Sequence, residues 1–320
     1  MRLIYTSTIR PMITYACGAW FFESRDISDD EKNPKSPISK FSISQTNIDK
    51  LERLQAACLR FITGSYARSP REPLEKEMFI DSIQIYLSRM ASSYRTRVVY
   101  TPTARALADV WTNQLHPYSV LRHHALKADN DIKHLFFAQH HIHANQRWEM
   151  PRQRSKAIAR YFEQKAFRES SALWDCYRAN QGNRPSIQVT LMECWGPQSL
   201  QYYQGLSRAQ CTMLLQCRTG FIGLNAYLYK IRVPNIASPC CPCGMDFDTV
   251  EHRFLYCNNL NAERKELERS VFNHRSIPSL LTDEAAAASS WAIRYWGIHQ
   301  FEWTRKHMSD ILSGTIPVSK

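Results

Sequence analysis

The clearest structural signal in the sequence is the segment NIDKLERLQAACLRFITG, residues 47–64. Its apolar side chains recur at three- and four-residue intervals, as on one face of an α-helix. They are Ile48, Leu51, Leu54, Cys58, Phe61 and Ile62. Asn47 is a suitable N-cap, and Gly64 can take the left-handed conformation that often ends a helix. The segment therefore predicts an amphipathic helix whose apolar stripe faces the core.

Helical spacing extends through most of the chain, whereas strand patterns are few. Further helices are predicted over residues 81–99, 104–126, 150–180, 206–228 in two pieces, 262–273 and 283–311. The polar stretch 23–45 is typical of a surface loop, and residues 181–200, with two glycines and two prolines, are typical of a linker. We predict a mainly α fold in three segments, residues 1–100, 101–200 and 201–320, the last carrying a small zinc-knuckle-like unit with flanking helices.

The composition favours an anionic partner. The 320 residues carry a formal net charge of +12 and a pI of about 9.3, which points to nucleic acid before membrane. No apolar run approaches the roughly 18 residues of a membrane helix, and no clean signal-cleavage site follows the N-terminus. We expect an intracellular protein, nuclear or cytoplasmic and not secreted, with no membrane partner and no small-molecule substrate.

Four of the ten cysteines cluster near a histidine. Cys241, Cys243, His252 and Cys257 have the spacing C-x-C-x8-H-x4-C, and three thiolates with one imidazole are a donor set that Zn²⁺ takes as a tetrahedron. Gly244 gives the backbone room to turn between the first two ligands. On a regular helix Cys257 lies about 140° away from His252, so the helix must end or loosen between them.

Two alternatives to this ligand set stay open at the level of sequence. Cys240 is a rival first ligand, which would convert the first pair to the commoner C-x2-C spacing. The four residues can also be unrelated thiols near a surface histidine. The prediction is one structural zinc ion held by Cys241, Cys243, His252 and Cys257.

The residues around this motif resemble the C-terminal tail of fungal LINE-type (non-LTR) retrotransposon reverse transcriptases. The similar text begins with YQGLSRA, residues 203–209, and LLQCRTG, residues 214–220. It continues through Cys241–Gly244, TVEH at residues 249–252 and LYC at residues 255–257. In that family the block follows an RNase H domain, so the resemblance implies the end of a polyprotein.

The N-terminal part is similar to the thumb of the same polymerases. The similarity covers LIY at residues 3–5, IRP at residues 9–11, ITY at residues 13–15, the helix 47–64 and IYL at residues 85–87. In the family this helix follows the template–primer backbone. The resemblance therefore implies that Lys50, Arg53, Arg60 and Arg68 contact phosphates without reading sequence.

A second basic run spans residues 147–168 and carries seven basic residues against two acidic ones. We expect Arg152, Arg154, Lys156 and Arg160 to contact phosphates. The alternative is that this run is only a solvated helix face. The expected partner is RNA or DNA, bound without sequence preference.

The family's catalytic carboxylates have no counterpart in this sequence. The polymerase needs an aromatic-x-Asp-Asp turn, and the one Asp-Asp pair, Asp29-Asp30, lies in the polar loop without flanking strand patterns. We therefore expect a retrotransposon fragment with no catalytic residues, inactive alone, that binds nucleic acid and zinc. Two alternatives are part of an active RNA-directed DNA polymerase completed by another chain, and a host-adopted zinc and nucleic-acid-binding module.

Overall fold

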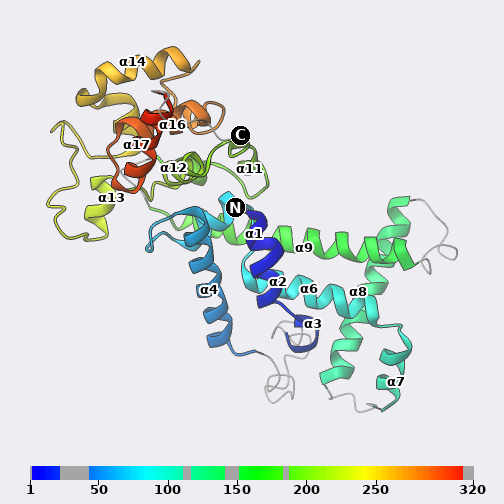
Figure 1. Cartoon of the computed structure of the whole chain (residues 1–320). Helices are drawn as coiled ribbons and strands as arrows, with labels where there is room; N and C mark the ends of the chain where they lie inside the picture. Colours follow the sequence, from blue (N-terminus) through cyan, green and yellow to red (C-terminus); the bar gives the residue numbers. More distant parts are fainter. Residues whose placement is uncertain (1, 22–42, 111–116, 141–150, 183–186, 313–320) are drawn as a thin grey trace. The chain divides into compact units, whose positions relative to one another are not determined.

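A computed structural model describes the whole chain except residues 1, 22–42, 111–116, 141–150, 183–186 and 313–320 (Figure 1). The described residues are mainly helical and form no sheet, with one isolated antiparallel bridge between Cys240 and Phe247. The mainly α fold predicted from the sequence is confirmed. Asp29 and Asp30 lie outside the described residues.

The chain divides into two compact units, and each is assembled from separate stretches of sequence. Unit 1 comprises Met1–Tyr5, Ala56–Ile80 and Leu173–Lys320, and unit 2 comprises Thr6–Gln55 and Asp81–Ala172. Helices α4 (Gln45–Thr63) and α9 (Pro151–Ala179) contribute residues to both units. The units therefore cross the boundaries of the three segments expected from the sequence.

Unit 1 is a cluster of mostly short helices around one apolar core. Its centre is the contact of α12 (Arg208–Thr219) with α16 (Ala285–Tyr295), where Leu214, Ala288 and Ala292 are fully buried. Around this pair lie α5 (Arg71–Met78), α10 (Val189–Met192), α11 (Ser199–Tyr202), α13 (Asn225–Lys230), α14 (Asn261–Ser270), α15 (Ile277–Leu280) and α17 (Glu302–Leu312).

Unit 2 is built around α6 (Ile83–Val98), which packs against α3 (Cys17–Trp20) and α8 (Pro117–His140). Its other helical segments include η1 (Tyr5–Ile9), α2 (Arg10–Ile13), α7 (Pro102–Val110), the first part of α4 as far as Gln55 and the first three quarters of α9. Ile83 and Leu87 are fully buried in one core, and a second core joins α8 and α9 through Ile132 and Ile158.

Helix α4 occurs where the sequence predicts it, but it is rotated about its axis. Gly64 follows its end with φ of +68°, as expected, whereas Asn47 lies inside the helix, which begins two residues earlier. The predicted apolar stripe is wrong at Leu54 and Phe61, which are 47% and 80% exposed. The buried face is carried instead by Ile48, Gln55, Ala56, Leu59 and Ile62, because packing selects which side of the helix is covered.

Most of the other predicted helices agree with the structure in position and differ in continuity. The prediction over residues 104–126 is wrong in its bounds, because it covers most of α7 and only the first part of α8, which continues to His140. Helix α9 opens at Pro151, and the predicted break between α12 and α13 falls at residues 220–224. The helix predicted over residues 283–311 is interrupted by Gly297, which has φ of +67°. Within the described part of the chain, no helix is both long and apolar enough to span a bilayer.

Candidate metal centre

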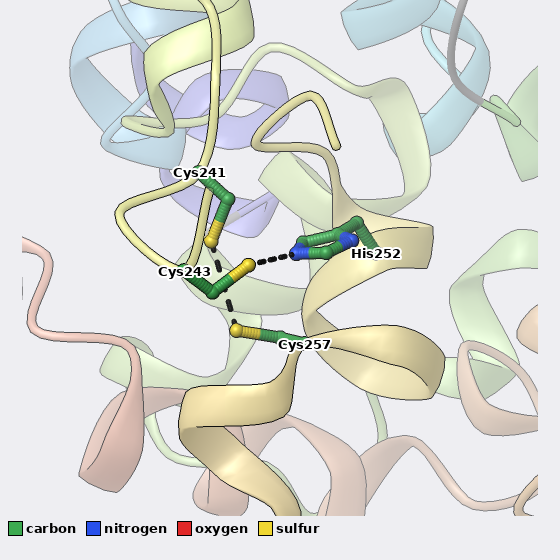
Figure 2. Close-up of side chains that lie close together, drawn as sticks. All are labelled: Cys241, Cys243, His252 and Cys257. Atoms are coloured by element: carbon green, nitrogen blue, oxygen red, sulfur yellow. Dashed lines mark hydrogen bonds between the residues drawn. The ribbon is translucent and has the colours of Figure 1, made fainter. Parts of the chain in front are cut away.

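Four side chains from a short stretch of unit 1 converge on one point (Figure 2). The thiol sulfurs of Cys241, Cys243 and Cys257 and a ring nitrogen of His252 all lie within 4.8 Å of one another. The Sγ atoms of Cys241 and Cys257 are 3.6 Å apart, and the Sγ atom of Cys243 is 3.1 Å from Nε2 of His252. The structure thus brings together all four residues of the predicted ligand set.

A tight turn presents the first two cysteines. The backbone N–H of Gly244 donates to the carbonyl of Cys241 at 2.9 Å, and Gly244 has φ of +77°, where an L side chain is strained. The N–H of Cys241 donates to the carbonyl of Asp246 at 2.8 Å, which closes the small hairpin. Glycine is therefore needed here to turn the chain between two ligands that are one residue apart.

A single π-helical turn brings the last two ligands onto one side of the chain. Segment η4 (His252–Tyr256) has the wider π-helical winding, and the N–H of Cys257 donates to the carbonyl of His252 at 2.7 Å. This i→i+5 bond replaces the i→i+4 bond of an α-helix, so five residues complete roughly one turn. Cys257 itself is extended, with φ of −62° and ψ of 117°. The prediction that the helix loosens before Cys257 is confirmed.

Polar contacts fix the start of this turn. The hydroxyl of Thr249 accepts a hydrogen bond from the N–H of His252 at 3.2 Å and so caps the turn. The buried carboxylate of Asp248 pairs with Arg253 at 2.5 Å and accepts from the N–H of Asn225 at 3.0 Å. The loop that carries the cysteines and the turn that carries His252 are thereby tied to α13.

The two sides of the cluster differ in their tendency to ionise. Burial raises the pKa of the Cys241 thiol to about 12, so this group is neutral at pH 7 in the absence of a cation. The backbone N–H of Met245 and the neighbouring thiols and imidazole lower the pKa of Cys243 to about 6. Binding of a metal ion at this site must therefore release protons, because cysteine binds a metal as the thiolate and not as the thiol.

The geometry of the cluster fits a four-coordinate soft metal ion. Zinc–sulfur bonds of about 2.3 Å in a tetrahedron put two sulfurs about 3.8 Å apart, close to the Cys241–Cys257 distance of 3.6 Å. His252 and Cys257 are 2% and 0% exposed, and Nδ1 of His252 is buried without a hydrogen-bond partner among the described residues. Nε2, 3.1 Å from Sγ of Cys243, is the ring nitrogen that faces the cluster.

Cys240 does not take part in this arrangement. Its side chain is exposed, its N–H donates to the hydroxyl oxygen of Ser238 at 3.1 Å, and its carbonyl accepts from the side-chain amide of Asn225 at 3.0 Å. It lies at the isolated bridge with Phe247, outside the group of four ligand atoms. The structure places buried Cys241, and not Cys240, as the first member of the cluster.

The side chains expected to contact phosphates differ in what they already bind. On α4, Lys50 and Arg53 are exposed, with Nε of Arg53 donating to the carbonyl of Asp49 at 3.2 Å. Arg60 is half-buried and donates to the carbonyl of Ser69 at 2.8 Å, while exposed Arg68 donates to the carbonyl of Ile231 at 2.6 Å. Arg60 and Arg68 therefore hold loops of unit 1.

The four residues of the second basic run also differ in exposure and in pairing. Arg152, Lys156 and Arg160 are exposed on α9. Arg154 is turned inward, where it pairs with buried Asp129 at 2.8 Å and donates to the carbonyl of Thr96 at 2.6 Å at the end of α6. Arg154 thus holds α9 to its neighbours inside unit 2.

Sequence reasoning missed a second buried cluster of ionisable groups, which we call the Glu77–Arg218 network: Lys76, Glu77, Glu193 and Arg218. The guanidinium of Arg218 donates twice to the carboxylate of Glu77, at 2.9 and 3.1 Å, and once to Glu193 at 2.8 Å. Lys76 completes the network through an ion pair with Glu193. Burial alone raises the pKa of Glu77, but Arg218 and Lys76 outweigh it and leave that pKa below its ordinary value.

No family model, curated protein or solved structure matches this sequence.

Proposed function

We propose that the chain is a non-catalytic part of a LINE-type retrotransposon reverse transcriptase that holds one structural Zn²⁺ and binds nucleic acid. The observation that carries the proposal is the convergence of Cys241, Cys243, His252 and Cys257 within 4.8 Å, inside the block that resembles the family's tail. The alternatives are part of an active polymerase completed by another chain and a host-adopted binding module.

Zinc is the metal that this donor set favours. Three thiolates and one imidazole are soft to borderline ligands, which select Zn²⁺ over Mg²⁺ or Ca²⁺, and four protein ligands leave no position for substrate. Cys241, His252 and Cys257 are buried, which is typical of a closed structural site. The ion would neutralise the thiolates and join the hairpin of Cys241 to η4.

Metal analysis of the purified full chain tests the zinc proposal. We expect one zinc per chain in the wild type, none in Cys257→Ser, and one in the matched control Cys240→Ser, because the exposed thiol of Cys240 lies outside the cluster. Equal zinc content in the wild type and Cys257→Ser would contradict the ligand set. Loss of zinc in Cys240→Ser would identify Cys240 as a ligand.

Nucleic-acid binding is the second part of the proposal. The net charge of +12 and the exposed cations of α4 and α9 support it, since lysine and arginine contacts to phosphate release counterions. With about five such contacts, log K falls with log salt at a slope of about −4 to −5 on duplex. Fluorescence anisotropy with random-sequence RNA and DNA measures the slope. Absence of binding at low salt, or binding that ignores salt, would contradict this part.

The non-catalytic part of the proposal depends on the missing aromatic-x-Asp-Asp turn. We expect no extension of a primed RNA template by the purified chain with Mg²⁺ or Mn²⁺. Template-dependent extension that Asp29→Ala abolishes would favour the polymerase alternative.

A further inference from the structure

A groove of about 310 Å³ runs between α8 and α9 in unit 2. Its lining includes Leu135, Phe136 and Gln139 of α8 and Lys156, Arg160 and Tyr161 of α9. The volume falls at the lower end of the range of about 300–1,000 Å³ that small-ligand sites occupy. One flat ring with its attached sugar is a suitable occupant by size.

The charged side chains that line the groove are all cationic. Lys156 and Arg160 line it, and no aspartate or glutamate does so among the described residues. Together with Arg152 they form a row at four-residue intervals, so successive cations stand about 6 Å apart along the helix axis. This row matches a linear polyanion in charge, and a neutral or basic partner gains nothing from it.

The aromatic rings of the groove are held by the core beneath them. Phe136 lies edge-on to buried Phe137, with ring centroids 5.9 Å apart, and Tyr161 lies edge-on to buried Phe162, with centroids 5.2 Å apart. Both outer rings are half-buried and line the groove. A flat ligand therefore meets rings that lose little freedom on binding.

Amide groups complete the polar side of the groove. Gln139 and Gln153 stand in its lining, and Oε1 of Gln153 is buried with no hydrogen-bond partner among the described residues. A buried unpaired acceptor is unfavourable, and an amino or imino group of a ligand can satisfy it. Nucleobases carry such groups on the edges that pairing would otherwise occupy.

We propose that the α8–α9 groove binds an unpaired base of a single-stranded nucleic acid, with the backbone following Arg152, Lys156 and Arg160. The proposal rests on the nucleic-acid-binding half of the proposed function. It adds a binding site and a preference for single-stranded over duplex nucleic acid. A base inside a duplex is stacked on both faces, so only an unpaired base can enter the groove and lie against Tyr161 or Phe136.

The first experiment removes the stacking ring from the full chain. We expect Tyr161→Leu to weaken binding of a single-stranded oligonucleotide of roughly eight residues by about 5- to 100-fold, the usual value of one base–aromatic contact. The matched control is Phe167→Leu, another partly exposed aromatic of α9, which lies outside the groove lining. An abasic oligonucleotide of the same length should bind both variants equally, because it keeps the phosphates and lacks the rings.

The second experiment changes charge and keeps the rings, and it uses only exposed side chains, which tolerate substitution. For single strands, Lys156→Gln with Arg160→Gln should make the slope of log K against log salt less steep by about 1.4, since each phosphate contact contributes about 0.7 to that slope. The control pair, Lys165→Gln with Arg168→Gln, removes the same charge from exposed positions of α9 outside this groove. We expect it to leave the slope within error of the wild type.

The outcomes separate this proposal from the one it rests on. If the wild type binds single strands and each groove variant binds like its control, the groove assignment is wrong and nucleic-acid binding stands. If the wild type binds no nucleic acid at low salt, both are wrong. Equal affinity of the wild type for duplex, single strand and polyglutamate also overturns the groove assignment, because such binding depends on charge alone. Unchanged circular dichroism of each variant shows that it is folded.

Discussion

Two clusters of largely buried ionisable side chains in the described part of unit 1, the Cys₃His cluster and the Glu77–Arg218 network, differ in how their charge is balanced. The network is neutral by itself, since two carboxylates meet one guanidinium and one ammonium that the same chain provides. The Cys₃His cluster has no cationic side chain among its four members and becomes neutral only by holding protons or a metal ion. The network is therefore balanced by the folded chain alone, whereas the Cys₃His cluster could be balanced by an added cation.

The network also joins more of unit 1 than the Cys₃His cluster does. Glu77 accepts from the hydroxyls of Thr190 and Tyr203, both at 2.6 Å, and Arg218 donates to the carbonyl of Leu281 at 2.8 Å. These contacts connect α5, α10, α12 and the end of α15. A missing partner therefore leaves buried charge at the centre of unit 1, whereas loss of the proposed metal ion would loosen only one hairpin and one turn.

The largest expected effect is the loss of Arg218. Arg218→Met should destabilise unit 1 by about 3–5 kcal/mol, because it leaves the carboxylate of Glu77 buried with its main partner removed. Urea unfolding measures the change, and Arg208→Met, at an exposed arginine of the same helix, is the control. Glu77→Gln combined with Arg218→Met should recover part of the loss. A destabilisation equal to the control would show that the network contributes no stability.

Zinc removal should have the next largest effect, and it tests the dependence on an added cation. With free zinc at a hundred times its Kd, the bound ion stabilises the fold by about 2.7 kcal/mol, and a chelator should remove that stabilisation. Thermal unfolding with zinc and with chelator measures the difference. Adding zinc back should restore the stability of the wild type, but it should not restore the stability that Arg218→Met loses. An unfolding curve insensitive to chelator would contradict the zinc proposal.

A smaller effect is expected from the ion pair that supports the cluster. Arg253→Gln breaks the pairing with Asp248 and should lower zinc affinity about tenfold, the lower end of the range for groups that position metal ligands. Competition with a zinc-sensitive dye measures the affinity, and Arg269→Gln, an exposed residue of α14, is the control. Unchanged affinity would show that the pair positions no ligand.

The smallest expected effect is a change with pH in the loss of stability that Arg218→Met causes. In the wild type the pKa of Glu77 lies below its ordinary value of 4.5, so its contribution to stability is present above that pH and is lost as the pH falls through the lowered pKa. Without Arg218, burial dominates and the pKa of Glu77 rises. The stability gap between the wild type and Arg218→Met should therefore narrow from pH 7 to pH 4.5, by at most about 1.4 kcal/mol per unit of pKa change. Urea unfolding at both pH values measures this difference in unfolding free energy. A difference that does not change with pH would show that Arg218→Met destabilises the unit through lost packing.

The sequence by itself determined the helical class and the composition of the Cys₃His cluster. Cys241 and Cys257 are only 16 positions apart, so local rules are enough to bring them together. A glycine with positive φ turns the hairpin, a threonine caps the next turn, and the 140° offset on a regular helix requires a looser winding before Cys257. Each of these rules concerns residues that are near in the chain.

Only the tertiary structure decided which helix faces are covered and which charges meet. Glu77 and Arg218 are 141 positions apart, and neither spacing nor composition marks them as partners. The periodicity of α4 predicts a helix, but the covered face includes Gln55 and excludes Phe61, because neighbouring elements select the rotation. The inward turn of Arg154 has the same origin, since its acceptors on α6 and α8 meet α9 only in the folded unit. Burial and long-range pairing depend on which surfaces come together, and that choice is made by the packed core as a whole.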